Sequence, residues 1–213
     1  MIIAIDGPAA AGKGTLARRL AQHLNLAMLD TGLLYRGTGW GVLKAGGDPA
    51  DPVAAAKAAQ ALEPADLNNS TLRSEECGSA ASKVAAIPAV REALLEWQRR
   101  FAHKPPKGFA GAVLDGRDIG TKVCPDADVK LFITANVEER AKRRLKELQE
   151  KGSEAIYARV LQDMKERDDR DSNRGVAPLV PAPDALIIDT GPLDAEQVFK
   201  LALDYISSRN RSG

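Results

Sequence analysis

The sequence predicts a three-layer α/β fold, in which a parallel sheet of five strands lies between two layers of helices. Three observations indicate this fold. Short, near-continuous apolar runs alternate with helical stretches, as in a parallel sheet that is covered on both faces. Most of these runs are followed directly by an aspartate, at the edge of such a sheet where ligands bind. A glycine-rich loop follows the first run and opens a helix.

The apolar runs are the predicted strands. They are residues 2–5, 27–29, 111–114, 129–133 and 185–188, and the aspartates that follow runs are Asp6, Asp30, Asp115 and Asp189. The predicted helices extend from the glycine-rich loop to about Leu24, from about Thr31 onward, from Val137 to about Lys151, and from Asp194, as a plausible N-cap, to about Ser207.

Two stretches lie outside this alternation. Residues from about 46 to 106 hold Ala-rich and charged helical segments without a clear strand, and they are too long for a connection in a compact domain. We predict a small helical subdomain there. Residues 150–175 are dense in charges of both signs. A charge-dense helix is usually a solvated surface, but the order of the charges in this stretch indicates a further role.

The composition limits the class of protein. A chain of 213 residues with 44% hydrophobic residues suits one α/β domain, and a net charge of +1 argues against a general nucleic-acid-binding surface. Cys77 and Cys124 have no spacing typical of a metal site or a disulfide framework. We expect no signal peptide before the first strand, and no apolar run approaches the ~20 residues of a membrane span. We expect a soluble protein in the cytoplasm that makes no contact with nucleic acid or membrane.

The glycine-rich loop predicts a site for a nucleoside triphosphate. Its glycines let backbone N–H groups surround a polyphosphate, and the following helix directs its positive end to the same place. Lys13 reaches the β- and γ-phosphates in such loops, and a hydroxyl just after the lysine binds Mg²⁺. The strict pattern has Ser or Thr directly after the lysine, whereas Gly14 intervenes here before Thr15, a spelling associated with small-molecule and nucleotide kinases. The loop residues are Gly7, Pro8, Ala9, Ala10, Ala11, Gly12, Lys13, Gly14 and Thr15.

A row of arginines in the charged stretch has helical spacing. Arg167, Arg170, Asp171 and Arg174 follow the i, i+3, i+4, i+7 pattern that places residues on one face of a helix. One interpretation is a set of salt bridges to the aspartates between them. The other is a ridge of arginines over a transferring phosphoryl group, since guanidinium groups match phosphate oxygens and stay charged.

Two further basic clusters follow strands. Thr31 is expected to cap a helix after the second strand, with Tyr35 and Arg36 one turn along it. Arg117 and Asp118 follow a glycine at the end of the third strand. Because the carboxyl ends of parallel strands meet at one edge, these arginines converge on the crevice that holds the phosphate-binding loop. They predict a site for a second phosphate, which belongs to the acceptor.

These segments together resemble the bacterial cytidylate kinases, nucleoside monophosphate kinases of the P-loop class. The match extends over nearly the whole chain, and the blocks 115–121 and 167–174 are its most specific parts. Residues 46–79 match poorly, and a shortened version of the small antiparallel sheet of many family members is expected there. The matching segments are residues 5–8, 12–15, 29–32 with Tyr35 and Arg36, 82–85 with Val90 and Arg91, 115–121, 167–174 and 177–179.

The resemblance implies a P-loop kinase fold and an activity. The fold would be a single domain with a core of residues 1–45, 107–149 and 172–213, a monophosphate-binding insert at 46–106 and a short lid at 150–171. The activity would be transfer of the γ-phosphoryl group of ATP to CMP or dCMP, giving ADP and CDP or dCDP. Mg²⁺ would accompany ATP, the partners would be these small molecules alone, and the chain would be a monomer.

The resemblance also implies roles for individual residues. Lys13 and Arg170 would contact the donor phosphates, and Asp171 would bind the ribose hydroxyls. Thr15 would bind Mg²⁺, and Asp115 would order it through water. The arginines that hold the acceptor phosphate would be Arg36, Arg117, Arg167 and Arg174. The residues with a catalytic role would be Lys13, Arg117, Arg167, Arg170 and Arg174. The residues in contact with CMP would include Thr31 and Tyr35, with Ser82, Arg91 and Asp118 at the base.

Cytosine offers an amine as donor and two acceptors, so a carboxylate on the amine and a guanidinium on the acceptors complement it. Uracil reverses this pattern, which disfavours UMP at Asp118 and Arg91. Other P-loop kinases, acting on UMP, AMP or a non-nucleotide such as shikimate, are the nearest alternative. A nucleotide-dependent switch or assembly protein is the alternative from another class, although it would need no acceptor site.

Overall fold

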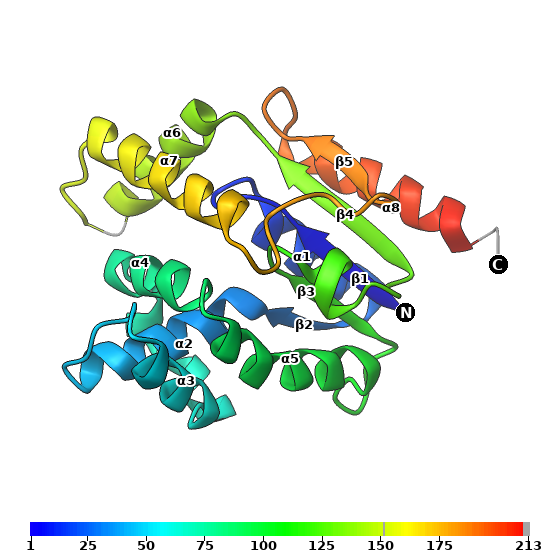
Figure 1. The fold of residues 1–213 in the computed structure, drawn as a ribbon. Coiled ribbons are helices and arrows are strands. Elements are labelled where there is room, and N and C mark those ends of the chain that lie inside the picture. The colour runs from blue at the N-terminus through cyan, green and yellow to red at the C-terminus, as the bar shows by residue number, and fades with distance from the viewer. Residues whose placement is uncertain (151, 211–213) are drawn as a thin grey trace.

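Five parallel strands form a single sheet in the computed structural model, which describes residues 1–150 and 152–210 (Figure 1). The order across the sheet is β2-β3-β1-β4-β5, and every pairing is parallel. The α/β class with five parallel strands is therefore confirmed. The strands are β1 (Ile2–Asp6), β2 (Ala27–Asp30), β3 (Ala112–Asp115), β4 (Val129–Thr134) and β5 (Leu186–Asp189).

The parallel register brings strand-end carboxylates together at one edge. Asp30 of β2 lies opposite Asp115 of β3, and Ile5 of β1 pairs with the same aspartate. The glycine-rich loop leaves β1, the central strand, beside them. The carboxyl edge of the sheet thus holds both the loop and two carboxylates, as the sequence predicted.

Side chains alternate between the two faces of the sheet, although the apolar runs are nearly continuous. Ile3 and Ile5 pack with α1 (Lys13–Leu24) and α8 (Ala195–Asn210) in one cluster of the core. Ala4 between them packs in a second cluster with residues of α2 (Thr31–Lys44) and α5 (Pro88–His103). Both faces of the sheet are covered, so the three layers are confirmed.

Residues 46–106 are helical, and no strand occurs among them. Figure 1 shows α2, α3, α4 and α5 gathered on one side of the sheet. The prediction of a reduced antiparallel sheet in this region is therefore wrong, because the short helical turns η1 and η2 occupy its place. The elements of this region are α3 (Pro52–Gln60), η1 (Pro64–Asn68), η2 (Ser70–Arg73), α4 (Glu75–Val84) and α5.

The helix α5 packs directly on the sheet, with Val90 and Leu94 in the same cluster as Leu114 of β3. This part of the predicted insert therefore belongs to one of the covering layers. The division into a core, an insert at 46–106 and a lid at 150–171 stays a prediction.

Two helices form a pair at the carboxyl edge of the sheet. They are α6 (Val137–Glu150) and α7 (Tyr157–Asn173), and they share a small apolar cluster that includes Ala141, Val160 and Met164. Figure 1 shows them side by side. Lys151, where the third helix was predicted to end, and residues 211–213 of the predicted core lie outside the described residues.

The start of α8 and the end of α7 test two further predictions, those for Asp194 and Arg174. The Asp194 carboxylate accepts hydrogen bonds from the backbone nitrogens of Glu196 and Gln197 at 2.9 and 2.8 Å, so Asp194 is the N-cap of α8 as predicted. Arg174 follows the end of α7 and has an extended backbone, so its predicted place on the helical face is wrong. Across the described ranges, no helix combines the length and apolar character that crossing a membrane requires.

Candidate active site

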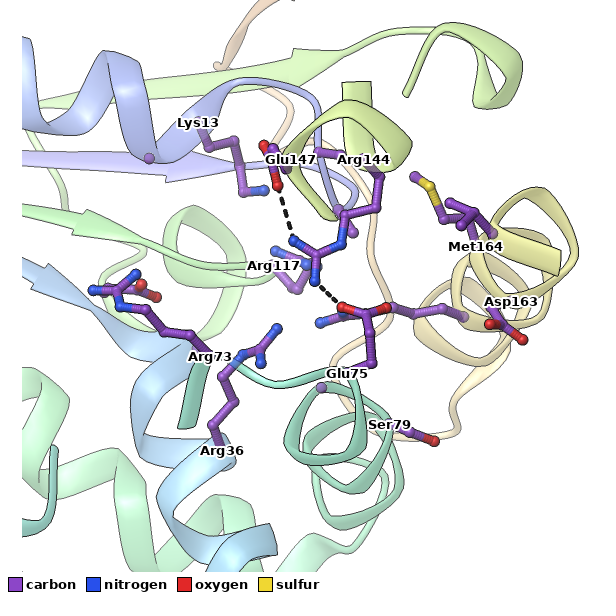
Figure 2. Close-up of a pocket in the computed structure, with 18 of the residues that line it drawn as sticks. Lys13, Arg36, Arg73, Glu75, Ser79, Arg117, Arg144, Glu147, Asp163 and Met164 are labelled. Atoms are coloured by element: carbon purple, nitrogen blue, oxygen red, sulfur yellow. Dashed lines mark hydrogen bonds and ion pairs between the residues drawn. The ribbon is translucent and has the colours of Figure 1, made fainter. Parts of the chain in front are cut away.

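A cavity of about 800 Å³ opens at the carboxyl edge of the sheet. Its walls come from the phosphate-binding loop and α2 on one side, α4 on a second, and α6 and α7 on a third (Figure 2). Ten of the lining residues are Lys or Arg and seven are Asp or Glu, so the cavity favours an anion of several charges. The basic lining residues are Lys13, Arg18, Arg36, Arg73, Lys83, Arg117, Arg144, Arg159, Arg167 and Arg170.

The phosphate-binding loop has the backbone that its glycines predict. Gly7 has a φ of 143°, and a Cβ atom there would lie 1.9 Å from the carbonyl oxygen of Ile133, so only glycine fits against β4. Gly12 has a φ of 96° just before α1. Such left-handed residues turn successive N–H groups inward around an anion. The loop residues that line the cavity are Ala9, Ala10, Gly12, Lys13, Gly14 and Thr15.

The remaining loop residues stand behind this lining. Pro8 accepts a hydrogen bond at its carbonyl from Lys13 Nζ at 2.8 Å, and the Ala11 carbonyl accepts one from Thr190 Oγ1 at 3.0 Å. Gly7 packs against β4. These three residues support the loop rather than face the cavity.

Lys13 is buried and stands among like charges. Burial, followed by the Arg117 guanidinium, lowers the pKa of Lys13 to about 7. Its nearest carboxylate is that of Asp115, 3.9 Å from Lys13 Nζ to Oδ1. Phosphate oxygens in the cavity would supply the negative charge that this ammonium lacks.

Thr15 and Asp115 both line the cavity next to Lys13 and offer a hydroxyl and a carboxylate. Oxygen donors of this kind suit Mg²⁺, which keeps several waters and takes few protein ligands. Burial raises the pKa of Asp115, an effect that a cation beside it would oppose. The residues present therefore fit a magnesium ion that is carried by the triphosphate.

The Asp171 carboxylate organises the arginines of this region. Arg117 Nε donates to Asp171 Oδ2 at 3.1 Å, and Arg167 Nε lies 4.0 Å from the same oxygen. Although burial acts in the opposite direction, Arg117, Arg167 and Arg174 lower the pKa of Asp171. The salt-bridge interpretation of the row is thus correct for Asp171, and it coexists with arginines that line the cavity.

Arg167 has a buried Nε atom that lacks a hydrogen-bond partner among the residues that the structure describes. Burial, and then the Arg117 guanidinium, lowers the pKa of Arg167 to about 9, so the group remains protonated at pH 7. An unsatisfied buried donor with a net charge is destabilising unless a ligand pairs with it.

Two of the three residues predicted to contact the base, Arg91 and Asp118, meet outside the cavity lining. Arg91 of α5 forms an ion pair with Asp118, and Arg174 NH2 lies 3.5 Å from the other oxygen of that carboxylate. The Arg91 guanidinium also lies 5.5 Å from the centroid of the Tyr35 ring. The structure therefore brings Tyr35, Arg91, Asp118 and Arg174 together, in a buried group behind the phosphate cavity.

Arg170 and Ser82 join two walls of the cavity. Arg170 Nε of α7 donates to Ser82 Oγ of α4 at 3.2 Å. Ser82 is buried and does not line the cavity, whereas Arg170 does. Arg36 lines the cavity as predicted, and its NH1 is oriented by the carbonyls of Leu72 and Ser74 at 2.7 and 2.9 Å.

The predicted capping role of Thr31 is wrong. The residue is the first of α2, and its hydroxyl donates to the Asp115 carbonyl at 2.8 Å instead of to the helix. This bond joins the start of α2 to the end of β3. Thr31 therefore positions Arg36 and Asp115 relative to each other.

Asp6 is a site residue that sequence reasoning missed. Its carboxylate accepts from the backbone nitrogens of Ile119 and Gly120 at 2.7 and 2.8 Å, and so holds the turn that follows Asp118. Burial raises the pKa of Asp6 to about 7, against the effect of these two bonds. Its place directly before Gly7 is the signal that could have identified it, since it ties the donor loop to the acceptor loop.

Arg144 of α6 was also missed. It lines the cavity and is paired with Glu75 of α4 and Glu147 of its own helix (Figure 2). The sequence shows Arg140, Arg143 and Arg144 on one charged helix, and their spacing alone does not distinguish the one that faces the cavity, because Arg140 and Arg144 lie on the same face.

Comparison with known proteins agrees with this geometry. A family model described as cytidylate kinase matches residues 3–208. The cytidylate kinase of Paramagnetospirillum magneticum is 65% identical over 208 residues, 98% of each chain, and that of Rhodospirillum rubrum is 57% identical over 211 residues, 99% of each. A solved structure of an uncharacterized protein from Eubacterium ventriosum has a TM-score of 0.57 at 17% identity, covering 98% of this chain and 99% of that one, which supports the fold alone. The chain belongs to the cytidylate kinase family.

Proposed function

We propose that the chain transfers the γ-phosphoryl group of ATP to CMP or dCMP, giving ADP and CDP or dCDP. One observation carries this proposal beyond the family relationship. Lys13, which is buried, and Arg167, which is partly buried, face one cavity with too few carboxylates to neutralise them, and the buried Arg167 Nε has no hydrogen-bond partner among the described residues. Such a site requires several ligand charges, which a triphosphate and a monophosphate together provide.

The donor end of the cavity is the phosphate-binding loop. Its backbone and Lys13 hold the β- and γ-phosphates, and the start of α1 directs its positive end at them. Thr15 and Asp115 hold the magnesium ion of Mg·ATP, directly and through water. Mg²⁺ neutralises charge on the phosphates when it is bound.

The acceptor end lies toward α2 and α4. Arg36, Arg117 and Arg167 contact the phosphate of the monophosphate, and Arg170 approaches the transferring group from α7. These guanidiniums lie where negative charge spreads over the γ-phosphate during transfer. Positioning and charge neutralisation account for most of the acceleration in such reactions, so we assign no general base.

The base and ribose would be held by the buried group behind the cavity. Asp118 and Arg91 would turn from each other to the cytosine amine and its acceptors, and Ser82 would leave Arg170. Asp171 would bind the ribose hydroxyls, and Arg174, tied to Asp118, would complete the acceptor site. The Asp118–Arg91 and Ser82–Arg170 pairs would separate when CMP binds. Recognition of cytosine would therefore be linked to the arrangement of the catalytic arginines.

The test is an ADP-release assay with Mg·ATP and, separately, CMP, dCMP, UMP, AMP and shikimate. Turnover with CMP and dCMP well above that with UMP supports both the reaction and the base contacts. A slow ATPase that no acceptor accelerates would contradict the proposal and favour a nucleotide-dependent switch. A monomeric state and a cytoplasmic location stay predictions, which gel filtration with light scattering and cell fractionation would test.

A further inference from the structure

Arg144 is a cavity residue to which the proposed reaction assigns no role. Its neighbours on α6 are bonded within the protein. Arg140 forms hydrogen bonds to the Asp168 carboxylate at 3.2 and 2.6 Å, and Arg143 NH1 donates to Thr190 Oγ1 at 2.8 Å. Arg144 alone of these three lines the cavity. Figure 2 shows its side chain entering the cavity from α6.

Two carboxylates hold the Arg144 guanidinium in this position. NH1 donates to Glu147 Oε2 at 2.8 Å, and NH2 forms an ion pair with Glu75. Glu147 lies three residues further along the same helix, so its contact with Arg144 does not depend on the other walls of the cavity. Glu75 belongs to α4 on the opposite wall, and its contact spans the cavity. The Arg144 side chain is only 17% exposed, whereas that of Glu75 is 55% exposed.

The surrounding charges explain why Arg144 needs these carboxylates. After burial, the Arg144 guanidinium is the largest cause that lowers the pKa of Arg36, and it adds to the effects of burial and Arg117 on Arg167. Like charges this close repel one another. A flexible arginine without a partner on the far wall would turn outward to water, where its charge is solvated.

The pairing leaves donors free for a ligand. A guanidinium has five N–H donors, and Glu75 and Glu147 engage one terminal nitrogen each. Arg144 can therefore reach a phosphate oxygen without leaving either carboxylate. We propose that Glu75 is a positioning residue, which holds Arg144 across the cavity beside Arg36, where Arg144 contacts the phosphates during transfer. This inference rests on the proposed phosphoryl transfer and adds two residues to it.

The chain offers a matched control for Glu75. Glu75 and Glu76 both lie in the first turn of α4 and both line the cavity. Glu76 forms no ion pair with any residue that the structure describes. Glu75→Gln and Glu76→Gln thus remove the same charge from the same wall and change the same helix terminus. Only Glu75→Gln releases Arg144.

The experiment measures kcat and KM for CMP and for ATP in both variants, with melting temperatures as a check on folding. We expect Glu75→Gln to lower kcat with CMP about five- to tenfold, because a misplaced charge no longer meets the transferring group. The KM for ATP should stay within about twofold, and Glu76→Gln should stay within about twofold in every constant. Glu75→Asp, which keeps the charge, should recover part of the loss.

A double-mutant cycle with Arg144→Gln separates positioning from a general structural effect. If Glu75 acts through Arg144, adding Glu75→Gln to Arg144→Gln causes no further loss of kcat. Additive losses, equal behaviour of the Glu75 and Glu76 variants, or faster turnover in Glu75→Gln would overturn the inference. Absence of CMP-dependent ADP release by the unmodified enzyme would instead refute the proposed function, so the two failures are distinguishable.

Discussion

Binding of Mg·ATP is expected to take up a proton at Lys13. Burial, and then the Arg117 guanidinium, lower the pKa of this lysine to about 7 from an ordinary value of 10.5. Phosphate oxygens beside the amine restore the ordinary value. At pH 8 the free lysine is about nine-tenths neutral, so each ATP bound should bring about 0.9 of a proton with it.

The direction in which the affinity for Mg·ATP changes with pH follows from proton linkage. The bound state holds more protons than the free state above pH 7, so affinity for Mg·ATP falls as pH rises. From pH 7 to pH 8 the dissociation constant should increase about fivefold. Calorimetric titration in two buffers of different ionisation enthalpy measures the proton uptake directly, and Lys13→Arg, which stays charged throughout, is the control. Uptake near zero at pH 8, or equal uptake in Lys13→Arg, would refute this reasoning.

Three further substitutions test the acceptor site and the fold. Arg36→Ala should lower kcat with CMP by about 10²-fold and leave the ATP dissociation constant within about twofold, and an equal loss of ATP binding would contradict its place at the acceptor. Asp118→Asn should reduce the kcat/KM preference for CMP over UMP by about tenfold, and an unchanged ratio would remove Asp118 from base recognition. Asp194→Ala should lower the free energy of unfolding by about 1 kcal/mol in urea titration, because Glu196 and Gln197 lose the capping acceptor.

The parts of the fold that the sequence predicted well are those determined by local pattern. Continuous apolar runs ending in aspartate require buried parallel strands, and the loop before Lys13 requires glycine at positions 7 and 12, where the structure has positive φ. Asp194 was recognisable because capping depends on the side chain alone. The capping of α8 depends on residues that are close in the sequence, whereas Gly7 is also required by its close approach to Ile133 of β4.

Two predictions were wrong because the spacing of residues along the chain does not reveal the contacts or the helix end that decide them. Thr31 bonds to Asp115, 84 residues away, and this partner outcompetes the helix N-terminus. Arg174 lies just beyond the end of α7, and its Nε donates to the carbonyl of Ala177, three residues further on. Spacing along a helix identifies a shared face only while the helix continues, and no local signal marked its end at Asn173.

Helical spacing also does not predict which arginine of α6 enters the cavity. Arg140 and Arg144 are four residues apart and so lie on one face, yet Arg140 is bonded to the Ala9 and Ala135 carbonyls and to Asp168, whereas Arg144 enters the cavity. Because the partners of Arg140 belong to the phosphate-binding loop, to the end of β4 and to α7, only the packing of α6 against these segments shows which arginine is engaged.

The crowding of positive charge also explains which acceptors the site favours. Besides burial, Arg117 and Arg167 lower the pKa of Lys13, and Arg117 lowers that of Arg167, so part of the binding energy of an anionic ligand is relief of this repulsion. This relief grows with the charge that the ligand brings. A monophosphate carries about two negative charges at pH 7, whereas the carboxylate of shikimate carries one. Among acceptors of similar size, the cavity therefore selects a phosphomonoester, and the buried Asp118 and Arg91 are left to distinguish its base.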